Sequence, residues 1–296
     1  MEVSPRMQIQ TVLVGGQPVH YSARPGGAGS LALVGVNGLA GGGDSFWAVI
    51  AGIPAGVQVV LPDLPDCGDS AELPGEHTVA AYAHWLEDFR AVLGLERLVL
   101  TSVATGAPIT VRYAGLFPDR VAGLIFHLPM LGKAAVPRLL RPPVGYALRI
   151  GLLHRLVDRL RRNTAFMERI IAHEPPAAVP ELAVRDIAHK QQASLRATGD
   201  LLHDLMLHDY RPELAALRVP MLFLAAAHDP FAPLAHLEAL CRRPERRLYV
   251  EHDAPHSWNE PFIEHMNAEI AAFFARLGSD EGSGLMDQPD SPSPDP

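Results

Sequence analysis

The stretch "GLERLVLTSVATGAPITVRYAGLFPDRV", residues 94–121, sets the frame for the rest of the chain. Its apolar run Leu98–Leu100 predicts a buried strand, and the residues after "SVATG" predict a helix. A sharp strand-to-helix turn crowds the neighbouring backbone, so it needs small residues on both sides of its centre. Ser102 and Gly106 are such residues, two positions before and after Ala104. The stretch therefore predicts a strand–turn–helix unit centred on Ala104.

Strands and helices are expected to alternate on both sides of this unit. The expected strands are residues 9–14, 19–23, 31–36, 57–62, 97–102, 121–128, 220–226 and 246–251. The expected helices include residues 78–93, 105–117, 232–242 and 259–277. Gly15 and Gly16 between the first two strands predict a hairpin. The later alternation predicts a mostly parallel sheet with helices on both faces.

Residues 130–210 interrupt this rhythm, because they carry helical patterns without a convincing strand. One set of apolar residues in this segment predicts a single buried stripe: Leu148, Leu152, Leu153, Leu156, Val157 and Leu160. Most of the nearby arginines lie off that stripe: Arg149, Arg155, Arg159, Arg161 and Arg162. These arginines predict a solvated helix face. The alternative is a docking patch for an acidic partner, such as a carrier protein or an anionic substrate.

Bulk composition excludes several classes of protein. The chain has 296 residues, 48% hydrophobic and 20% charged, which fits one large α/β domain or two smaller ones. The net charge of −8 argues against a nucleic-acid partner. No run of 18 apolar residues and no signal-peptide core is present, so no membrane partner is expected. Cys67 and Cys241 fit a reduced, cytoplasmic protein.

The final segment, residues 278–296, differs in composition from the rest of the chain. It contains five acidic residues, no Lys or Arg, and many Pro, Ser and Gly residues. Such a segment has little apolar surface to bury, so it predicts a disordered acidic tail.

Several stretches carry a resemblance to a known family. "VNGLAGGGDSF" (36–46), "DLPDCGDS" (63–70), the stretch 94–121, "LAAAHDPFAP" (224–233) and "EHDAPHSWNEPF" (251–262) are similar to stretches of the α/β-hydrolase fold family. Eight strands, beginning with a hairpin and interrupted after the sixth by helices, also resemble that fold with a cap. The resemblance covers roughly residues 8 to 277.

The resemblance implies an eight-stranded, mostly parallel sheet with helices on both faces and a helical cap inserted after strand six. The core would then comprise residues 1–129 and 211–277, and the cap residues 130–210. In most family members the stretch equivalent to residues 63–70 is structural, and the same role is expected here.

The nucleophile of the family sits in a strand–turn–helix elbow that usually reads G-x-S-x-G. Counting forward from Gly94 and backward from Pro118 both place that position at Ala104. Ser102 would need two residues inserted in the strand and two removed from the helix to take this role. The resemblance therefore implies an elbow that carries alanine in place of the attacking serine.

Two more residues match the family's catalytic positions. Asp229 follows the seventh strand with Pro233 four residues on, as the family's acid does, and His256 lies on the loop after the eighth strand. Their order along the chain is that of the family: nucleophile, acid, histidine.

The resemblance also implies an oxyanion hole. Its donors would be the backbone N–H groups of Leu39 and of Thr105, at the start of the helix. Asn37 stands where the family usually has a histidine. The residues expected to line the substrate site are Asn37, Gly38, Ser102 and His127.

Alanine at position 104 removes the covalent route, so no acyl-enzyme is expected. Three explanations remain open. The chain is a deliberate knockout of a serine hydrolase whose parent reads "SVSTG", or a natural enzyme in which His256 and Asp229 act as a general base pair without a nucleophile. Alternatively, it is a pseudoenzyme that binds a ligand or a protein partner without turnover.

The expected substrate is a small-to-medium carbonyl compound. Leu, Met, Phe and Pro residues of the cap segment predict an apolar pocket with few charges, which suits an ester, lactone or thioester. No phosphate-binding glycine motif and no metal-ligand spacing is present, so neither a cofactor nor a metal is predicted.

Overall fold

The computed structural model describes residues 7–27, 31–133, 142–171 and 179–283. An eight-stranded sheet in the order β1-β2-β4-β3-β5-β6-β7-β8 forms its centre. The strands are β1 (Gln8–Val14), β2 (Gln17–Arg24), β3 (Ala32–Val36), β4 (Gln58–Pro62), β5 (Leu98–Val103), β6 (Val121–His127), β7 (Met221–Ala226) and β8 (Arg246–Glu251). All eight overlap the strands that were predicted from the sequence.

The direction of pairing divides the sheet into two parts. β1 pairs with β2 and β2 with β4 in antiparallel fashion, whereas β3 through β8 pair in parallel. The turn between β1 and β2 uses Gly15 (φ +56°) and Gly16 (φ +82°), a left-handed conformation that glycine adopts without steric cost. This is the predicted hairpin followed by a parallel sheet.

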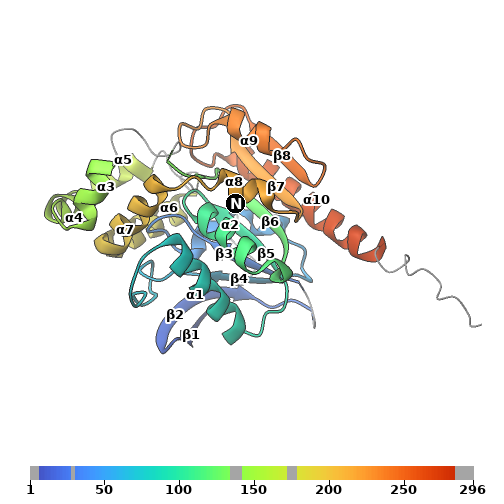
Figure 1. The fold of residues 1–296 in the computed structure, drawn as a ribbon, viewed down its shortest axis with the longest axis horizontal. Coiled ribbons are helices and arrows are strands. Elements are labelled where there is room, and N and C mark those ends of the chain that lie inside the picture. The colour runs from blue at the N-terminus through green and yellow to red at the C-terminus, as the bar shows by residue number, and fades with distance from the viewer. Residues whose placement is uncertain (1–6, 28–30, 134–141, 172–178, 284–296) are drawn as a thin grey trace, which may run out of the picture.

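Helices cover both faces of the sheet (Figure 1). The helices of the core are η1 (Gly43–Gly52), α1 (Val79–Val92), α2 (Gly106–Leu116), η2 (Pro118–Arg120), α8 (Arg211–Ala216), α9 (Leu234–Leu240) and α10 (Glu260–Ser283). The short helices η1, η2 and α8 were not predicted, because none is long enough to produce a clear apolar period.

Two apolar layers hold the sheet between these helices. On one face, residues of α1 and α2 such as Phe89 and Ile109 pack on strand residues such as Leu100. On the other face, η1 and α10 pack on the sheet through residues that include Phe46 and Phe273. The parallel strands β3, β5, β6 and β7 are buried along their whole length, which explains their continuous apolar sequences.

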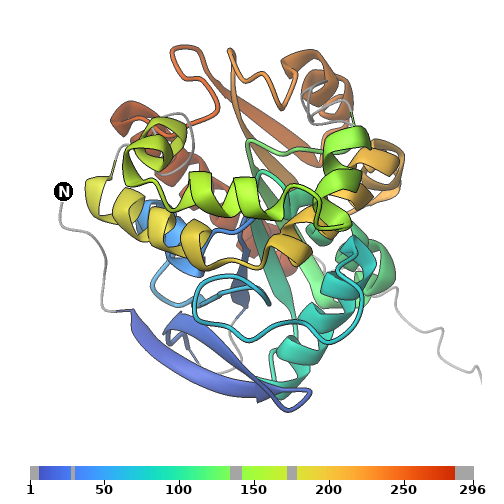
Figure 2. The same cartoon turned by 90° about the vertical axis from the view of Figure 1, so that its left-hand side faces the viewer.

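A helical cap is inserted after β6, as predicted. It consists of α3 (Pro142–Arg149), α4 (His154–Arg161), α5 (Thr164–Ile171), α6 (Pro180–Gln192) and α7 (Leu195–Leu207). An antiparallel bridge between Gly132 and Asp209 and a hydrogen bond from Tyr210 N–H to Leu131 O (2.9 Å) bring the two ends of the insertion together. Figure 2 shows the cap helices in front of the sheet.

The structure corrects one expectation about the cap. The predicted stripe over 148–160 is not buried as a unit, since 73% of Leu152 and 55% of Leu156 are exposed. The prediction assumed one continuous helix. Instead, the chain changes direction at Gly151 (φ +79°) between α3 and α4, so the apolar residues no longer share one face. The side chain of Leu148 lies outside the described residues.

The carboxyl end also departs from the expected boundary. α10 continues to Ser283, beyond the predicted start of the acidic tail at residue 278. Residues 284–296 lie outside the described part of the chain. Among the described residues, no helix is both long and apolar enough to cross a membrane.

Candidate active site

The turn between β5 and α2 has Ala104 at its centre. Ala104 has φ +47°, a left-handed conformation that costs a non-glycine residue about 1–3 kcal/mol. Backbone hydrogen bonds fix the turn from both sides: the Ala104 N–H donates to His127 O (3.0 Å), and the Ala104 carbonyl accepts from Met130 N–H (3.1 Å). The Ala104 side chain is thereby held at the wall of a cavity.

Gly106, at the start of α2, permits this turn to pack against β3. A Cβ atom at this position would lie 2.3 Å from the carbonyl oxygen of Val36, a distance that backbone atoms cannot accept without moving. The small residue that the sequence pattern required two positions after Ala104 thus has a direct steric reason.

His256 and Asp229 come together from the loops that follow β8 and β7. The His256 Nδ1 atom lies 2.7 Å from Asp229 Oδ2, and the Asp229 side chain is fully buried. Asp229 Oδ1 accepts hydrogen bonds from the N–H groups of Phe231 (2.7 Å) and Ala232 (3.1 Å), which fix the carboxylate. When Nδ1–H donates to this carboxylate, Nε2 is left as the ring's acceptor. The Phe231 ring packs edge-on against His256, with 4.9 Å between ring centroids.

Ala104 and His256 share one cavity of about 330 Å³ between the core and the cap. The core contributes Gly38, Leu39 and Thr105 to its wall. The apolar cap residues along the cavity are Val157, Met167, Leu195 and Leu202. The wall of this cavity thus includes four of the expected site residues besides His256: Gly38, Leu39, Ala104 and Thr105.

The cavity also contains three charged side chains that were not predicted to line it: Arg161, Asp186 and Lys190. Arg161 was expected on a solvated helix face, but its side chain is only 15% exposed. Lys190 Nζ lies 2.7 Å from Asp186 Oδ2, and both side chains are largely buried. Arg161 donates to Asp158 and to the carbonyl oxygens of Lys190 and Ala193. The other residues along the cavity are mostly apolar. The i, i+4 spacing of Asp186 and Lys190 was the available signal.

One of the two expected oxyanion donors, the Leu39 N–H, already has a hydrogen-bond partner in this structure. The Leu39 N–H donates a hydrogen bond to Thr105 Oγ1, over a distance of 2.6 Å. A substrate oxygen could use the Leu39 N–H only after the Thr105 hydroxyl had rotated away.

Three of the four residues expected to line the substrate site do not lie along the cavity: Asn37, Ser102 and His127. All three are fully buried. Asn37 Nδ2 instead donates to the carbonyl oxygens of Gly38 and Gly41, which shapes the loop after β3. Ser102 belongs to β5 and His127 to β6, and both side chains are buried in the protein rather than at the cavity.

Burial determines the state of His127. It lowers the pKa of His127 to about 3, so the ring is neutral at ordinary pH. Its Nε2 atom lies 2.9 Å from Thr101 Oγ1, and its Nδ1 atom lies 3.4 Å from Met266 Sδ. A neutral ring with these partners has a packing role between the sheet and α10.

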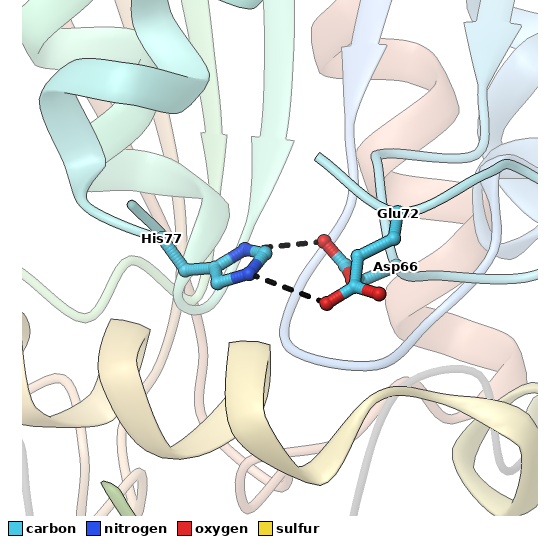
Figure 3. A group of neighbouring side chains, drawn as sticks. All are labelled: Asp66, Glu72 and His77. Carbon is cyan, nitrogen blue, oxygen red and sulfur yellow. Dashed lines mark ion pairs between the residues drawn. The ribbon is translucent and has the colours of Figure 1, made fainter. Parts of the chain in front are cut away.

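A second group of ionisable side chains lies in the segment that leads into α1 (Figure 3). His77 Nδ1 is 3.2 Å from Asp66 Oδ2, and His77 Nε2 is 3.8 Å from Glu72 Oε1. The hydrogen bond to Asp66 outweighs the effect of burial and raises the pKa of His77. Because each ring nitrogen of His77 faces a different carboxylate, the arrangement favours the imidazolium form. The Tyr82 hydroxyl also lies 3.4 Å from Asp66 Oδ2.

This group joins the core to α7. The Ser194 N–H, just before α7, donates to Asp66 O (3.4 Å). Asp204 of α7 accepts from the Val79 N–H (2.8 Å) at the start of α1. These two hydrogen bonds join the segment that leads into α1, and the start of α1 itself, to α7 of the cap.

We expect His77→Gln to lower the free energy of unfolding by about 2 kcal/mol near pH 6, because it removes a buried charged hydrogen bond. The pKa of His77 is higher in the folded protein than in the unfolded chain, where it is about 6.5. His77 therefore contributes fully to stability below a pH of about 6.5, and this contribution is lost as pH rises through the folded-state pKa. Urea unfolding of both proteins at pH values from about 6 to 9 measures this.

The difference between the two proteins should therefore shrink as pH rises. The matched control is His84→Gln, at an exposed histidine of α1, which should change the free energy of unfolding only slightly. A difference for His77→Gln that is constant or grows with pH would contradict the imidazolium assignment.

The fold agrees with comparisons to known proteins. A family model described as the alpha/beta hydrolase fold matches residues 32–260, which is most of the chain. The protein belongs to the α/β-hydrolase fold family.

Solved structures share this fold at low sequence identity. A thermophilic esterase from Thermogutta terrifontis is 22% identical, with a TM-score of 0.67 over 94% of this chain and 99% of that one. The enol-lactonase from Burkholderia xenovorans is 19% identical, with a TM-score of 0.70 over 90% and 100% of the two chains. At such identities the likeness shows the fold alone.

Among curated sequences, an uncharacterized protein of Mycobacterium tuberculosis is 28% identical over 121 residues, or 41% of this chain. An uncharacterized protein of Mycobacterium bovis matches to the same extent. The aligned part is 34% of each relative, so the chain spans about a third of the length of the curated relatives it matches.

Proposed function

We propose that His256, oriented by Asp229, acts as a general base on a small-to-medium carbonyl substrate bound between the core and the cap. The observation that carries this proposal is the 2.7 Å contact between His256 Nδ1 and the fully buried Asp229 carboxylate, at a cavity that Ala104 also lines. A histidine held in this way keeps its Nε2 atom free to accept a proton.

In this proposal Ala104 occupies the position where a serine hydrolase carries its nucleophile. Its methyl group cannot attack a carbonyl, so no covalent intermediate forms. His256 Nε2 instead removes a proton, either from a carbon next to the substrate carbonyl or from a water that attacks it. The N–H groups of Leu39 and Thr105 stabilise the negative oxygen that results, once the Thr105 hydroxyl has left the Leu39 N–H.

The substrate class follows from the cavity and from the named neighbours. Esters, lactones and thioesters present the carbonyl that this chemistry needs, and an esterase and an enol-lactonase are among the proteins with this fold. The apolar cap residues suit an acyl chain or ring, and the Asp186–Lys190 pair gives a polar group of the substrate a place to bind. The same cavity would serve a hydrolase if Ala104 stands for a serine removed on purpose.

A second candidate is binding without turnover, to a small ligand or a protein partner. The observation that favours it is the 2.6 Å hydrogen bond from the Leu39 N–H to Thr105 Oγ1, which satisfies an oxyanion donor without a substrate. Together with alanine at 104, this leaves a site that can hold a ligand without activating it.

Turnover of an ester, lactone and thioester panel by the wild type and His256→Gln tests the proposal. General-base catalysis predicts a loss of about 10²- to 10⁴-fold in kcat/KM for every compound that the wild type converts. The control is His252→Gln, on the same loop but away from the cavity, which should retain full activity.

Calorimetry with the same compounds separates the two candidates. If the wild type binds compounds but converts none, and His256→Gln binds them equally well, the site is one for binding only. If both proteins convert a compound at the same rate, His256 is not the base.

A further inference from the structure

The outer surface of the cap carries a concentration of exposed apolar side chains. Six of the twelve large hydrophobic side chains that are exposed in the described part of the chain lie between residues 146 and 166. They are Tyr146, Ile150, Leu152, Leu156, Leu160 and Phe166, with exposed fractions from 37% to 73%. We refer to these six side chains as the cap patch. Within α4, Leu156 and Leu160 are four residues apart and therefore lie on one exposed face of the helix. Exposed apolar side chains that lie together mark an interaction site.

Basic side chains accompany the cap patch. Between residues 142 and 171 the sequence has six arginines and only two acidic residues, in a chain whose net charge is −8. The exposed arginines of this segment are Arg149, Arg155, Arg159, Arg162 and Arg169. Arg149 pairs with Asp200 and Arg162 with Asp158, so these two charges are partly neutralised. The region that exposes apolar groups still carries an excess of basic residues on an acidic protein, which favours an occupant that is both apolar and anionic.

The shape of this region narrows the choice of occupant. α3 and α4 form the end of the cap farthest from the sheet, where they project from the molecule (Figure 1). The view turned by 90° shows the cap helices on the side of the molecule that faces the viewer (Figure 2). A projecting surface can lie against a broad partner without obstruction from the rest of the molecule. We propose that the cap patch docks the protein on an anionic lipid surface.

The chemistry of such a surface matches the side chains in two ways. Leu156 of α4 and Leu152, which precedes that helix, would enter the boundary between headgroups and acyl chains. Arg155 and Arg159 of α4 would remain among the anionic headgroups. Each arginine near the surface strengthens binding by about fivefold. This is peripheral docking, which requires no membrane-spanning helix. It departs from the sequence expectation that the protein has no membrane partner.

The docking surface and the cavity share their helices. Val157 and Arg161 of α4 and Met167 of α5 line the cavity, while Leu156 and Phe166 of the same helices are exposed. Docking would therefore hold the cavity's roof against the lipid, from which an apolar substrate could enter. The docking itself does not depend on the chemistry at Ala104 and His256, so the two proposals can fail separately.

Vesicle flotation with the full-length protein tests this proposal. Vesicles of phosphatidylcholine alone are compared with vesicles that contain about 30% phosphatidylglycerol. The wild type should float with the anionic vesicles and remain behind with the neutral ones, and added salt should weaken its binding.

Two double variants address the two kinds of contact. Arg155→Ala/Arg159→Ala should weaken binding to anionic vesicles by about 30-fold. Leu152→Gln/Leu156→Gln should weaken it by at least about tenfold. The matched controls are Arg218→Ala/Arg242→Ala and Ile9→Gln/Leu13→Gln, at exposed positions of the core, which should bind as the wild type does. Circular dichroism checks that each variant is folded, and gel filtration gives its size.

Three outcomes would overturn the proposal: no flotation of the wild type, equal losses in the cap and control variants, or equal binding to neutral and anionic vesicles. A wild-type dimer that Leu152→Gln/Leu156→Gln converts to a monomer would also overturn it, since a second copy would then cover the patch. If the variant Ala104→Ser does not react with a fluorophosphonate while the wild type still floats with anionic vesicles, only the proposed active site is contradicted.

Discussion

The variant Ala104→Ser should react with a fluorophosphonate at least about 10⁴-fold faster than the wild type. The turn already holds residue 104 at φ +47° at the wall of the cavity that His256 lines. A hydroxyl there would gain a neighbouring base that Asp229 orients, which is what a serine nucleophile needs. The measurement is the rate of covalent labelling of both proteins at equal concentration.

Two controls define what this gain means. Ala104→Ser/His256→Ala should lose the labelling, because the hydroxyl then has no base. Ala104→Ser/Ser102→Ala should keep it, since Ser102 is fully buried behind the cavity. Labelling that persists without His256, or that requires Ser102, would show that residue 104 is not the nucleophile position.

Asp229→Asn in the Ala104→Ser background should slow labelling by about 10⁴-fold. The amide preserves the shape of the side chain, but it cannot stabilise the charge that His256 gains, and it can donate to Nδ1 and so impose the wrong tautomer. The N–H groups of Phe231 and Ala232 that bind Asp229 Oδ1 keep the side chain in place. Labelling rates of the two serine proteins give the ratio directly.

The matched control for this change is Asp253→Asn in the same background. Asp253 lies on the loop of His256 but is exposed, so its replacement should leave the rate within about twofold. A loss of less than about tenfold for Asp229→Asn would mean that the buried carboxylate does not orient the base.

The sheet could be predicted from the sequence because burial on both faces leaves a strong local signature. β5, β6 and β7 are buried over their whole length, so each reads as an uninterrupted apolar run. The turns were equally informative, because Gly15 and Gly16 carry the left-handed conformation of the hairpin. In these cases the local sequence and the final structure impose the same constraint.

The cap was harder to predict for a physical reason. Its leucines have helical spacing, but spacing alone does not show where a helix bends or which face a neighbour covers. The bend at Gly151 left Leu152 and Leu156 exposed, although the pattern over a continuous helix predicted burial. The bound faces of short helices depend on tertiary packing, which periodicity does not record.

The candidate site was also predicted only in part. Asp229 and His256 follow strands with clear sequence signatures, and the structure brings them to 2.7 Å from each other. Ser102 and His127 lie at strand ends too, but the pleat turns their side chains into the protein. The i, i+4 spacing of Asp186 and Lys190 indicates that they pair, but it does not show that the pair lies at the cavity.

Peptide mapping of the Ala104→Ser protein after fluorophosphonate treatment tests the central claim most directly. The adduct should be found on residue 104, and the treated wild type should retain its unmodified mass. An adduct on Ser102, or on Ser45, which also lines the cavity, would show that residue 104 is not the centre of the active site.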